Sequence, residues 1–234
     1  MTLRFAATLG MLVLLASCAG PAGHAATPEP TPGAAEAHWI ELDAFEKSVP
    51  PAPITVVFDI DDTALYSSHA MLLAEGAFHL QHPEVAKPYD DCRLFGAVND
   101  SLDAKYSRAK QVAKRLVAFH VARHDRIVFI TKRCASTPPN DSTSAVLARK
   151  FGLATHPQVV FTNLAKKVEA FRTVKPAISY GDSDSDIEDT MTASKAMPDA
   201  PIRAVRIVRS TFSSNLFGST PGKFGEDVIV GSDL

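Results

Sequence analysis

The chain has 234 residues, of which 46% are hydrophobic and 21% charged, and its formal net charge is −2. This composition excludes a disordered chain and a coiled coil, and the length suffices for one domain with a sizeable core. The near-neutral charge gives no basic field for a nucleic-acid polymer. Three cysteines are too few for a disulfide scaffold. After the N-terminus no run reaches the roughly 18 apolar residues that a membrane helix needs.

The N-terminus has the pattern of an export signal. Arg4 precedes a short apolar core from Phe5 to Ala16, and this order is typical of a secretory signal rather than of a spanning helix. The core ends in Leu15-Ala16-Ser17-Cys18, which resembles the bacterial lipobox, in which the cysteine becomes the lipidated first residue. Simple cleavage after Ala25 is the alternative.

These signals predict three segments. They are a lipoprotein-type signal peptide over residues 1–17, a flexible leader rich in Ala, Pro and Gly over 18–36, and a folded domain over 37–234. Ala19 follows the cysteine where an Asp would favour the inner membrane. We therefore expect a periplasmic protein that contacts the outer membrane only through a lipid anchor.

Beyond the leader, β-branched runs alternate with stretches of helical spacing. This alternation predicts an α/β fold of Rossmann-like type, with a mostly parallel sheet covered by helices on both faces. Residues 68–103 have no clear period and are expected to form a small insertion after the first strand. The expected strands are 54–58, 127–131, 159–162, 177–180, 202–208 and 227–230, and the expected helices are 104–123, 142–151 (with Gly152 as its C-cap), 166–172 and 186–195.

Acids, a hydroxyl and a lysine follow the predicted strands. Because ligands of open α/β sheets bind outside the carboxyl ends of the strands, we expect these side chains to converge there. Crowded carboxylates repel and need a cation, and hard oxygen ligands that leave room for substrate phosphate suit Mg²⁺. The sequence therefore predicts a magnesium site for phosphate chemistry. The set is Asp59, Asp61, Thr131, Lys167, Asp182 and Asp186.

At these residues the chain resembles a known family. Asp59-x-Asp61-x-Thr63, Thr131, Lys167 and Gly181-Asp182-x3-Asp186 match the four motifs of the haloacid dehalogenase superfamily of phosphatases. The runs at 58–63, 129–131 with Arg133, 180–184 and 224–233 are similar to those of class B acid phosphatases. The resemblance extends from Ile54 to the end of the chain.

The resemblance implies how the site reacts. Asp59 would be the nucleophile that forms an aspartyl-phosphate, and Asp61 would be the general acid and base. The metal would bind the carboxylates of Asp59 and Asp182 and the backbone carbonyl of Asp61, and Asp186 would hold a metal-bound water.

The resemblance also implies the phosphate contacts. Thr131 would hydrogen-bond a phosphoryl oxygen, and Lys167 would neutralise charge on the phosphate and the nucleophile. Lys132 stands where the family usually has Gly; it keeps the backbone amide and adds a charge that could pair with substrate. Met71 stands where an aromatic is expected, so a preference for nucleotides is left open. Tyr66, Met71 and Phe217 either line the leaving-group pocket or lie in the core.

Other residues near the motifs have plainer interpretations. Asp62 and Asp184 are expected to be solvated turn residues, and Thr63 to cap the turn or the following helix. Cys92 and Cys134 both remain in the chain after the signal peptide is removed, which would allow a disulfide in an oxidising compartment. The sequence gives no distance between them, so the disulfide is left open.

We therefore expect an exported, Mg²⁺-dependent acid phosphatase of small phosphomonoesters. The family implies phosphotransfer to alcohols as a side activity and suggests a homotetramer. One alternative is a class C-type lipoprotein acid phosphatase, against which the Gly181–Asp184 and Phe224–Glu226 segments argue. The other is a non-catalytic surface lipoprotein that keeps the fold, which the intact acids disfavour.

Overall fold

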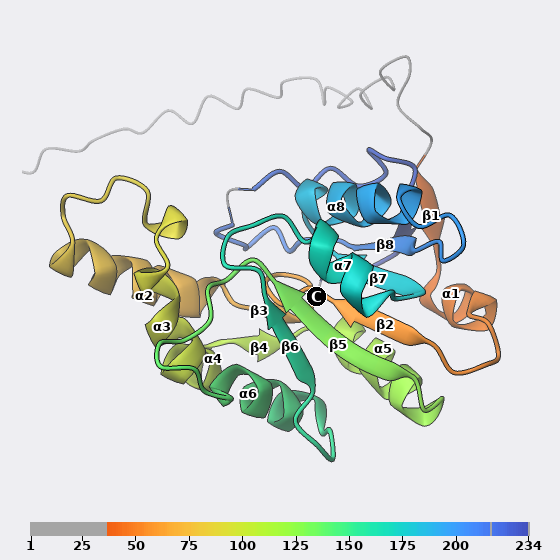
Figure 1. The fold of residues 1–234 in the computed structure, drawn as a ribbon, viewed down its shortest axis with the longest axis horizontal. Helices are drawn as coiled ribbons and strands as arrows, with labels where there is room; N and C mark the ends of the chain where they lie inside the picture. Colours follow the sequence, from red (N-terminus) through yellow and green to blue (C-terminus); the bar gives the residue numbers. More distant parts are fainter. Residues whose placement is uncertain (1–36, 216, 234) are drawn as a thin grey trace, which may run out of the picture. The chain divides into compact units, whose positions relative to one another are not determined.

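A seven-stranded parallel sheet forms the centre of the computed structural model, which describes residues 37–215 and 217–233 (Figure 1). The predicted signal peptide and leader, 1–17 and 18–36, lie outside the described residues. Every expected strand is present, with ends that differ by at most one residue from those predicted. In spatial order the strands are β1 (His38–Ile40), β9 (Asp227–Ile229), β8 (Arg203–Ile207), β7 (Ile178–Gly181), β2 (Thr55–Phe58), β5 (Arg126–Thr131) and β6 (Gln158–Phe161).

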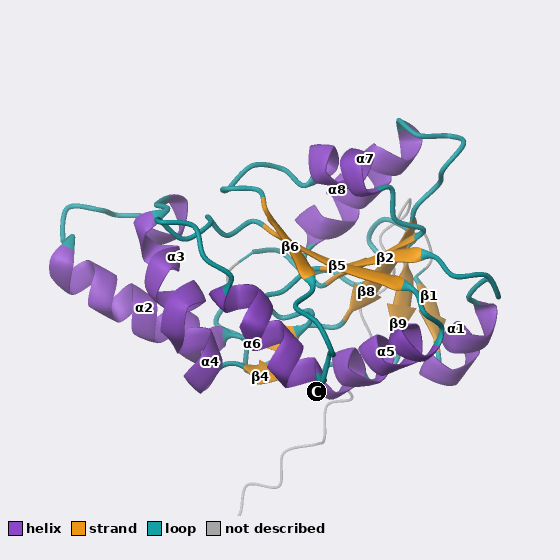
Figure 2. Ribbon diagram, turned by 60° about the horizontal axis from the view of Figure 1, so that its bottom comes forward, coloured by secondary structure: helices purple, strands orange, loops and turns teal. Residues whose placement is uncertain are grey.

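Helices cover both faces of the sheet, as predicted (Figure 2). On one face, Val56 and Phe58 of β2 share a buried cluster with Leu116. On the other face, Val57 shares a cluster with Phe171. Because successive residues of a strand point to opposite faces, a strand covered on both sides is apolar throughout. The first face carries α1 (Leu42–Ser48), α5 (Gln111–Ala122) and α6 (Ser142–Phe151), and the second carries α7 (Val168–Val174) and α8 (Asp184–Lys195).

The predicted insertion after the first expected strand is a small helical unit beside the sheet (Figure 1). A short antiparallel pair closes its base, with Leu65 opposite Ala109 and Tyr66 opposite Arg108. Its own cluster of buried side chains includes Phe78 and Leu94. The elements are β3 (Leu65–Tyr66), α2 (Ser68–Gln81), the short helical turns η1 (Pro88–Asp90) and η2 (Val98–Leu102), α3 (Arg93–Ala97), α4 (Asp103–Tyr106) and β4 (Arg108–Ala109).

A disulfide joins this insertion to the sheet. Cys92, at the start of α3, is bonded to Cys134, which lies beyond β5, and their Cα atoms are 5.2 Å apart. The pairing that the sequence left open is therefore present in the structure. It fastens the far side of the insertion next to the Thr131 motif.

One expectation about local structure was wrong, and two elements were not predicted. The predicted helix 104–123 is broken between α4 and α5, because β4 pairs with β3 and the Lys110 amide donates to the Ala64 carbonyl at 3.0 Å. The edge strand β1 and helix α1 were not predicted. β1 pairs with β9, from the far end of the chain, and such a long-range partner leaves no local signal. Among the described residues, no helix has both the length and the apolarity to cross a membrane.

Candidate active site at the carboxyl edge of the sheet

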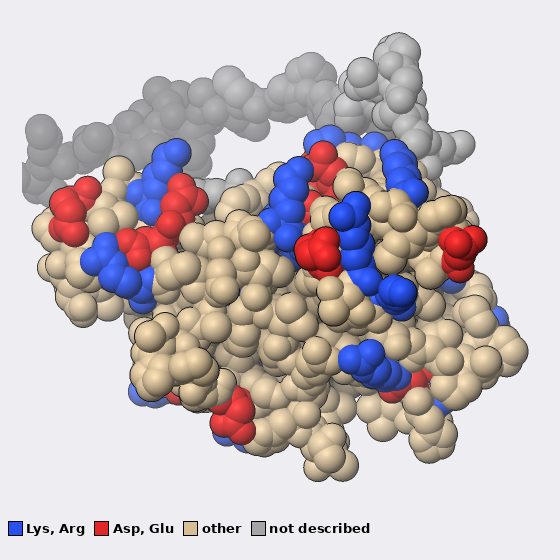
Figure 3. All heavy atoms as spheres, in the orientation of Figure 1, with Lys and Arg blue, Asp and Glu red and all other residues tan. Residues whose placement is uncertain are grey.

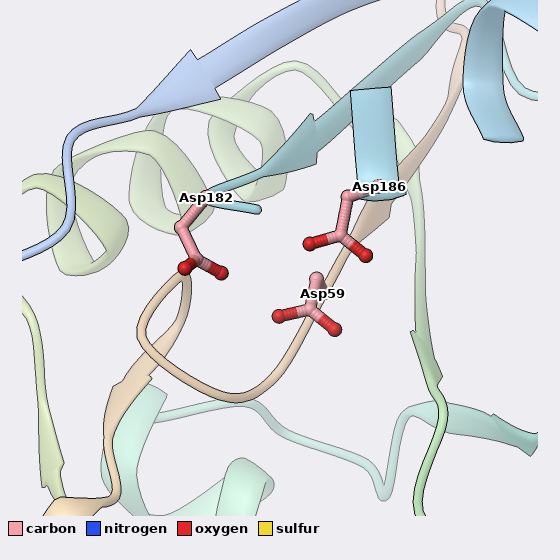
Figure 4. Close-up of side chains that lie close together, drawn as sticks. All are labelled: Asp59, Asp182 and Asp186. Carbon is pink, nitrogen blue, oxygen red and sulfur yellow. The ribbon is translucent and has the colours of Figure 1, made fainter. Parts of the chain in front are cut away.

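Three buried carboxylates converge at the carboxyl ends of β2 and β7. One oxygen each of Asp59, Asp182 and Asp186 lies within 4.8 Å of the others, and Figure 4 shows the three side chains close together, with their carboxylates turned to the same side. Asp59 directly follows β2, and its amide donates to the Tyr180 carbonyl at 2.9 Å. The central strands β2 and β7 therefore hold Asp59 and Asp182 in place.

Asp186 is fixed by the start of α8. It forms a capping box with Ser183: its amide donates to Ser183 Oγ at 3.2 Å, and its Oδ2 accepts from the Ser183 amide at 3.2 Å. Gly181 permits this approach, since a Cβ there would collide with the Asp186 Cβ. The glycine of the motif is thus a packing requirement.

Lys167 supplies the positive charge at the centre of the cluster. Its side chain is buried, its Nζ contacts Asp59 Oδ1, and it lies 2.8 Å from Asp186 Oδ1. Burial alone lowers the pKa of Lys167, but the charges of Asp186 and Asp59 outweigh burial and raise it. The lysine is therefore held protonated between the two acids.

The positive charge of Lys167 does not balance the negative charges of the three carboxylates. Burial raises the pKa of Asp59 well above its usual range; Lys167 opposes this, and the charges of Asp186 and Asp182 add to it. Burial, with the charge of Asp186, raises the pKa of Asp182 to about 7. An additional cation would relieve this repulsion. Carboxylate oxygens are hard ligands, so the donor set fits Mg²⁺.

Asp61 stands apart from that group and is held by an arginine. Arg133 donates from Nε to Oδ2 at 2.9 Å and from Nη2 to Oδ1 at 2.6 Å, while Ser67 Oγ donates to Oδ1 at 2.5 Å. Burial raises the pKa of Asp61, but the charge and hydrogen bonds of Arg133 outweigh burial, so the pKa lies below its usual value. Arg133 also contacts Asp103 and donates to Asn99 Oδ1 at 3.3 Å, so the insertion holds it.

Of the predicted phosphate-binding residues, the two lysines line the pocket with the carboxylates, and Thr131 is not part of that lining. Thr131, at the end of β5, is buried, and its Oγ1 accepts from the Arg133 amide at 3.2 Å. The side chain of Lys132 is 33% exposed, with Nζ 3.7 Å from Asp189 Oδ2. Lys132 and Lys167 both line the pocket that contains the carboxylates, whereas Lys166 is exposed outside that pocket.

Three of the plainer expectations need correction. Asp62 is buried rather than solvated, with a left-handed φ of 58°, and its Oδ2 accepts from Ser213 Oγ at 2.6 Å. Thr63 caps no helix; its buried Oγ1 donates to Asp182 Oδ1 at 3.0 Å, so it touches a predicted metal ligand. Asp184 begins α8 and lies 3.2 Å from the Nη1 of buried Arg206.

Strand β8 and the segment that follows it each bring to Asp182 one arginine that the sequence did not suggest. Arg209 Nε donates to Asp182 Oδ2 at 2.6 Å, and Arg206 Nη1 donates to the Asp182 carbonyl at 2.8 Å. Arg209 Nη1 also donates to the Asn215 carbonyl at 3.3 Å. No spacing in the sequence marks these arginines, because only the pairing of β8 with β7 places them there.

A cavity of about 520 Å³ opens above the carboxylates. The insertion forms one wall, which includes Met71, and the segment after β8 forms the other, which includes Phe217. Tyr66 is not part of the lining; its hydroxyl donates to the Phe212 carbonyl at 2.5 Å and fastens the second wall. On the face drawn in Figure 3, basic and acidic side chains lie interspersed.

Several bacterial enzymes of one kind are similar to the chain in sequence. The chain is 34% identical over 203 residues to the class B acid phosphatase of Haemophilus parainfluenzae, covering 84% of this chain and 81% of the relative. It is 32% identical over 206 residues to the class B acid phosphatase of Salmonella typhi, covering 85% and 81%. No family model matches the chain.

The fold has a counterpart among solved structures. The crystal structure of CbbY from Rhodobacter sphaeroides in complex with phosphate aligns with a TM-score of 0.52, covering 77% of this chain and 94% of that one. At 12% identity this likeness concerns the fold alone. The sequence relatives carry the assignment further: the chain belongs to the class B acid phosphatase family.

Proposed function

We propose that this protein is an exported, Mg²⁺-dependent acid phosphatase that hydrolyses small phosphomonoesters through an aspartyl-phosphate. One observation carries the proposal. Asp59 lies in a buried cluster with Lys167 and a second acid, while Asp61 is held separately by Arg133. The two carboxylates therefore have different environments, which suits a nucleophile and an acid–base catalyst that act on the same substrate.

The first half-reaction uses both carboxylates. Asp59 attacks the phosphorus as the bond from phosphorus to the ester oxygen breaks, and Asp61 gives its proton to that oxygen. Arg133 lowers the pKa of Asp61 and so favours its carboxylate form, which accepts a proton in the second half-reaction; the protonated form that donates becomes populated only as the pH falls. Lys167, already in contact with Asp59, offsets negative charge on the phosphoryl group.

The second half-reaction restores the enzyme. Water attacks the phosphorus of the aspartyl-phosphate, Asp61 takes the proton of that water, and inorganic phosphate leaves while the Asp59 carboxylate is regenerated. An alcohol in place of water would give phosphotransfer. Mg²⁺, held by Asp59, Asp182 and the carbonyl of Asp61, would withdraw charge from the phosphoryl oxygens. Asp186 would orient a water beside the ion, and Thr131 and Lys132 would bind the remaining phosphoryl oxygens.

Export, anchoring and assembly belong to the same proposal. Cys18 at the end of the apolar core supports a lipoprotein on the periplasmic side of the outer membrane, with residues 18–36 as its tether. A homotetramer follows from family resemblance. The Cys92–Cys134 disulfide supports an oxidising compartment, because such bonds persist outside the cytosol.

A metal-removal experiment tests the proposed chemistry. Purified protein should hydrolyse p-nitrophenyl phosphate, lose that activity in EDTA and regain it when Mg²⁺ is returned. Full turnover in a verified metal-free preparation would exclude the role of the ion. No turnover with any metal would favour the alternative of a non-catalytic lipoprotein.

A further inference from the structure

The insertion gives the pocket a wall that phosphate chemistry alone does not require. The cavity of about 520 Å³ is lined by the carboxylates and, from the insertion, by Met71, Pro88 and Phe95. Glu75 and Tyr89 line the same wall. This volume is far larger than a phosphoryl group, so the wall must contact the leaving group of the ester.

One oxygen of the Glu75 carboxylate accepts a hydrogen bond that orients the side chain, and the other accepts none from the described residues. The Tyr89 hydroxyl donates to its Oε2 at 3.0 Å. Its Oε1 lies 3.8 Å from His79 Nε2, beyond hydrogen-bond distance. The Glu75 side chain is 29% exposed. One carboxylate oxygen therefore keeps its full capacity to accept a hydrogen bond from a molecule in the pocket.

Tyr89 holds this carboxylate in the lining of the pocket that also contains Asp61. Burial, the hydrogen bond to Glu75 and the charges of Glu75 and Asp61 all raise the pKa of the Tyr89 hydroxyl, which is therefore a neutral donor. Asp61, Glu75 and Tyr89 all line the same cavity, so a leaving group released at Asp61 enters a space that the Tyr89–Glu75 pair borders.

The chemistry of this wall favours a cation. A carboxylate makes its strongest hydrogen bonds with a charged donor, and an aromatic ring beside it attracts the same charge. Lys87 and Asp90 also line the wall, but both are exposed and of opposite sign, so their effects are screened and offset each other. Of these charged residues in the wall, Glu75 is the one whose side chain is held in position by a hydrogen bond.

Building on the proposed phosphatase function, we infer that Glu75 selects phosphomonoesters whose leaving group carries a primary ammonium, that is, phosphorylated amino alcohols. The ammonium donates to Glu75 Oε1 beside Tyr89, while the phosphoryl group occupies the carboxylate end. A neutral alkyl group of the same length fills the same space without that bond. A carboxylate in its place meets the charge of Glu75.

Three esters of similar length test the inference: phosphoethanolamine, ethyl phosphate and phosphoglycolate. We expect kcat/KM for phosphoethanolamine to exceed that for ethyl phosphate roughly tenfold, the effect of one charge-assisted hydrogen bond at a partly exposed site. Glu75→Gln should bring this ratio close to one, and Tyr89→Phe should reduce it partly. The matched control is Glu84→Gln, since Glu84 lies in the same insertion outside the pocket lining and is 66% exposed.

Each outcome decides the inference. A ratio that falls in Glu75→Gln but not in Glu84→Gln supports it. A ratio that is unchanged by Glu75→Gln, or a wild-type preference for phosphoglycolate that would assign the wall to Lys87, overturns it while leaving phosphatase activity intact. Failure of the wild type to hydrolyse these esters and p-nitrophenyl phosphate alike overturns the proposed function, and the inference with it.

Discussion

The guanidinium of Arg133 donates to both carboxylate oxygens of Asp61, at 2.9 and 2.6 Å. The same guanidinium contacts the carboxylate of Asp103 in the insertion. Asp103 is fully buried, so the arginine is clamped between two acids from different parts of the chain. The orientation of the proposed catalytic acid therefore depends on the packing of the insertion.

Replacing this arginine should affect esters according to their leaving groups. In Arg133→Lys, the ammonium cannot donate to both oxygens in one plane, so Asp61 loses its fixed orientation. We expect kcat for ethyl phosphate to fall on the order of tenfold to a hundredfold, because an alkoxide needs a positioned proton donor. Hydrolysis of p-nitrophenyl phosphate, whose leaving group needs little protonation, should fall less. Equal losses for both esters would contradict this role; Arg93→Lys, exposed on the insertion, is the control.

The nucleophile can be tested by removing its charge. Asp59→Asn should reduce turnover by on the order of a thousandfold or more, because an amide oxygen does not form the covalent intermediate. The variant should keep the wild-type circular dichroism spectrum, and rapid quenching should trap no phosphoenzyme. Asp199→Asn, at an exposed position, should behave as wild type. Near-normal turnover by Asp59→Asn would remove this aspartate from the mechanism.

Thr63 should influence metal binding through Asp182. Thr63→Val keeps the shape of the side chain but removes the hydroxyl that donates to Asp182 Oδ1. We expect Mg²⁺ affinity, measured by titration calorimetry, to fall by about tenfold or more, as when a partner of a metal ligand is lost. Thr173→Val, at an exposed site on α7, is the control. Unchanged affinity in Thr63→Val would show that the hydroxyl does not tune this ligand.

A buried histidine should make stability depend on pH. His120 lies between Asp125 and the Tyr180 hydroxyl, at 2.7 and 2.8 Å, and is fully buried. Burial lowers its pKa, although Asp125 opposes this. Below about pH 6.5 His120 is therefore more fully protonated in the unfolded chain than in the folded chain. As a result, the free energy of unfolding falls as pH falls.

Urea unfolding at several pH values measures this effect. In His120→Gln the slope of unfolding free energy against pH between about 7 and 5 should be smaller than in wild type. Because the substitution also changes packing, the slope rather than the absolute stability is the informative quantity. His79→Gln, whose side chain is 45% exposed, should keep the wild-type slope. A slope that stays the same in His120→Gln would assign the pH dependence to other groups.

The lipid anchor is open to a direct mass measurement. Protein extracted from membranes should begin at Cys18 and carry the mass of the attached acyl chains. Cys18→Ser should release the protein into the soluble periplasmic fraction or block its processing. A wild-type chain that begins at Ala26 without lipid would rule the anchor out.

The sequence was most informative where the chemistry depends on local order. Asp59, Lys167 and Asp182 each follow an apolar strand, and parallel strands bring such residues to one edge whatever the details of the fold. The central strands were predictable for a related reason: a strand buried on both faces is a continuous apolar run. These features needed no knowledge of distant contacts.

The parts that sequence reasoning missed depend on distant contacts. Arg209 reaches Asp182 only because β8 lies beside β7, and Thr63 reaches the same acid across the loop after β2. The break before α5 likewise requires β4 to find β3. The sequence around Cys92 and Cys134 does not indicate how close the two cysteines lie in the fold. In each case the partner is far away along the chain, so local patterns do not reveal it.

The two ends of the insertion lie side by side, because Leu65 is paired with Ala109. A segment that enters and leaves a domain at one point can change length or sequence over evolution without displacing the strands that hold the nucleophile. The substrate preference that we infer for the insertion is in this sense separable from the position of Asp59, but not from that of Asp61, which Arg133 links to Asp103 of the insertion. The separation has a condition: any replacement must bring a cysteine to meet Cys134 and an acid to meet Arg133. Chimeras that exchange this segment between relatives should respect those two positions first.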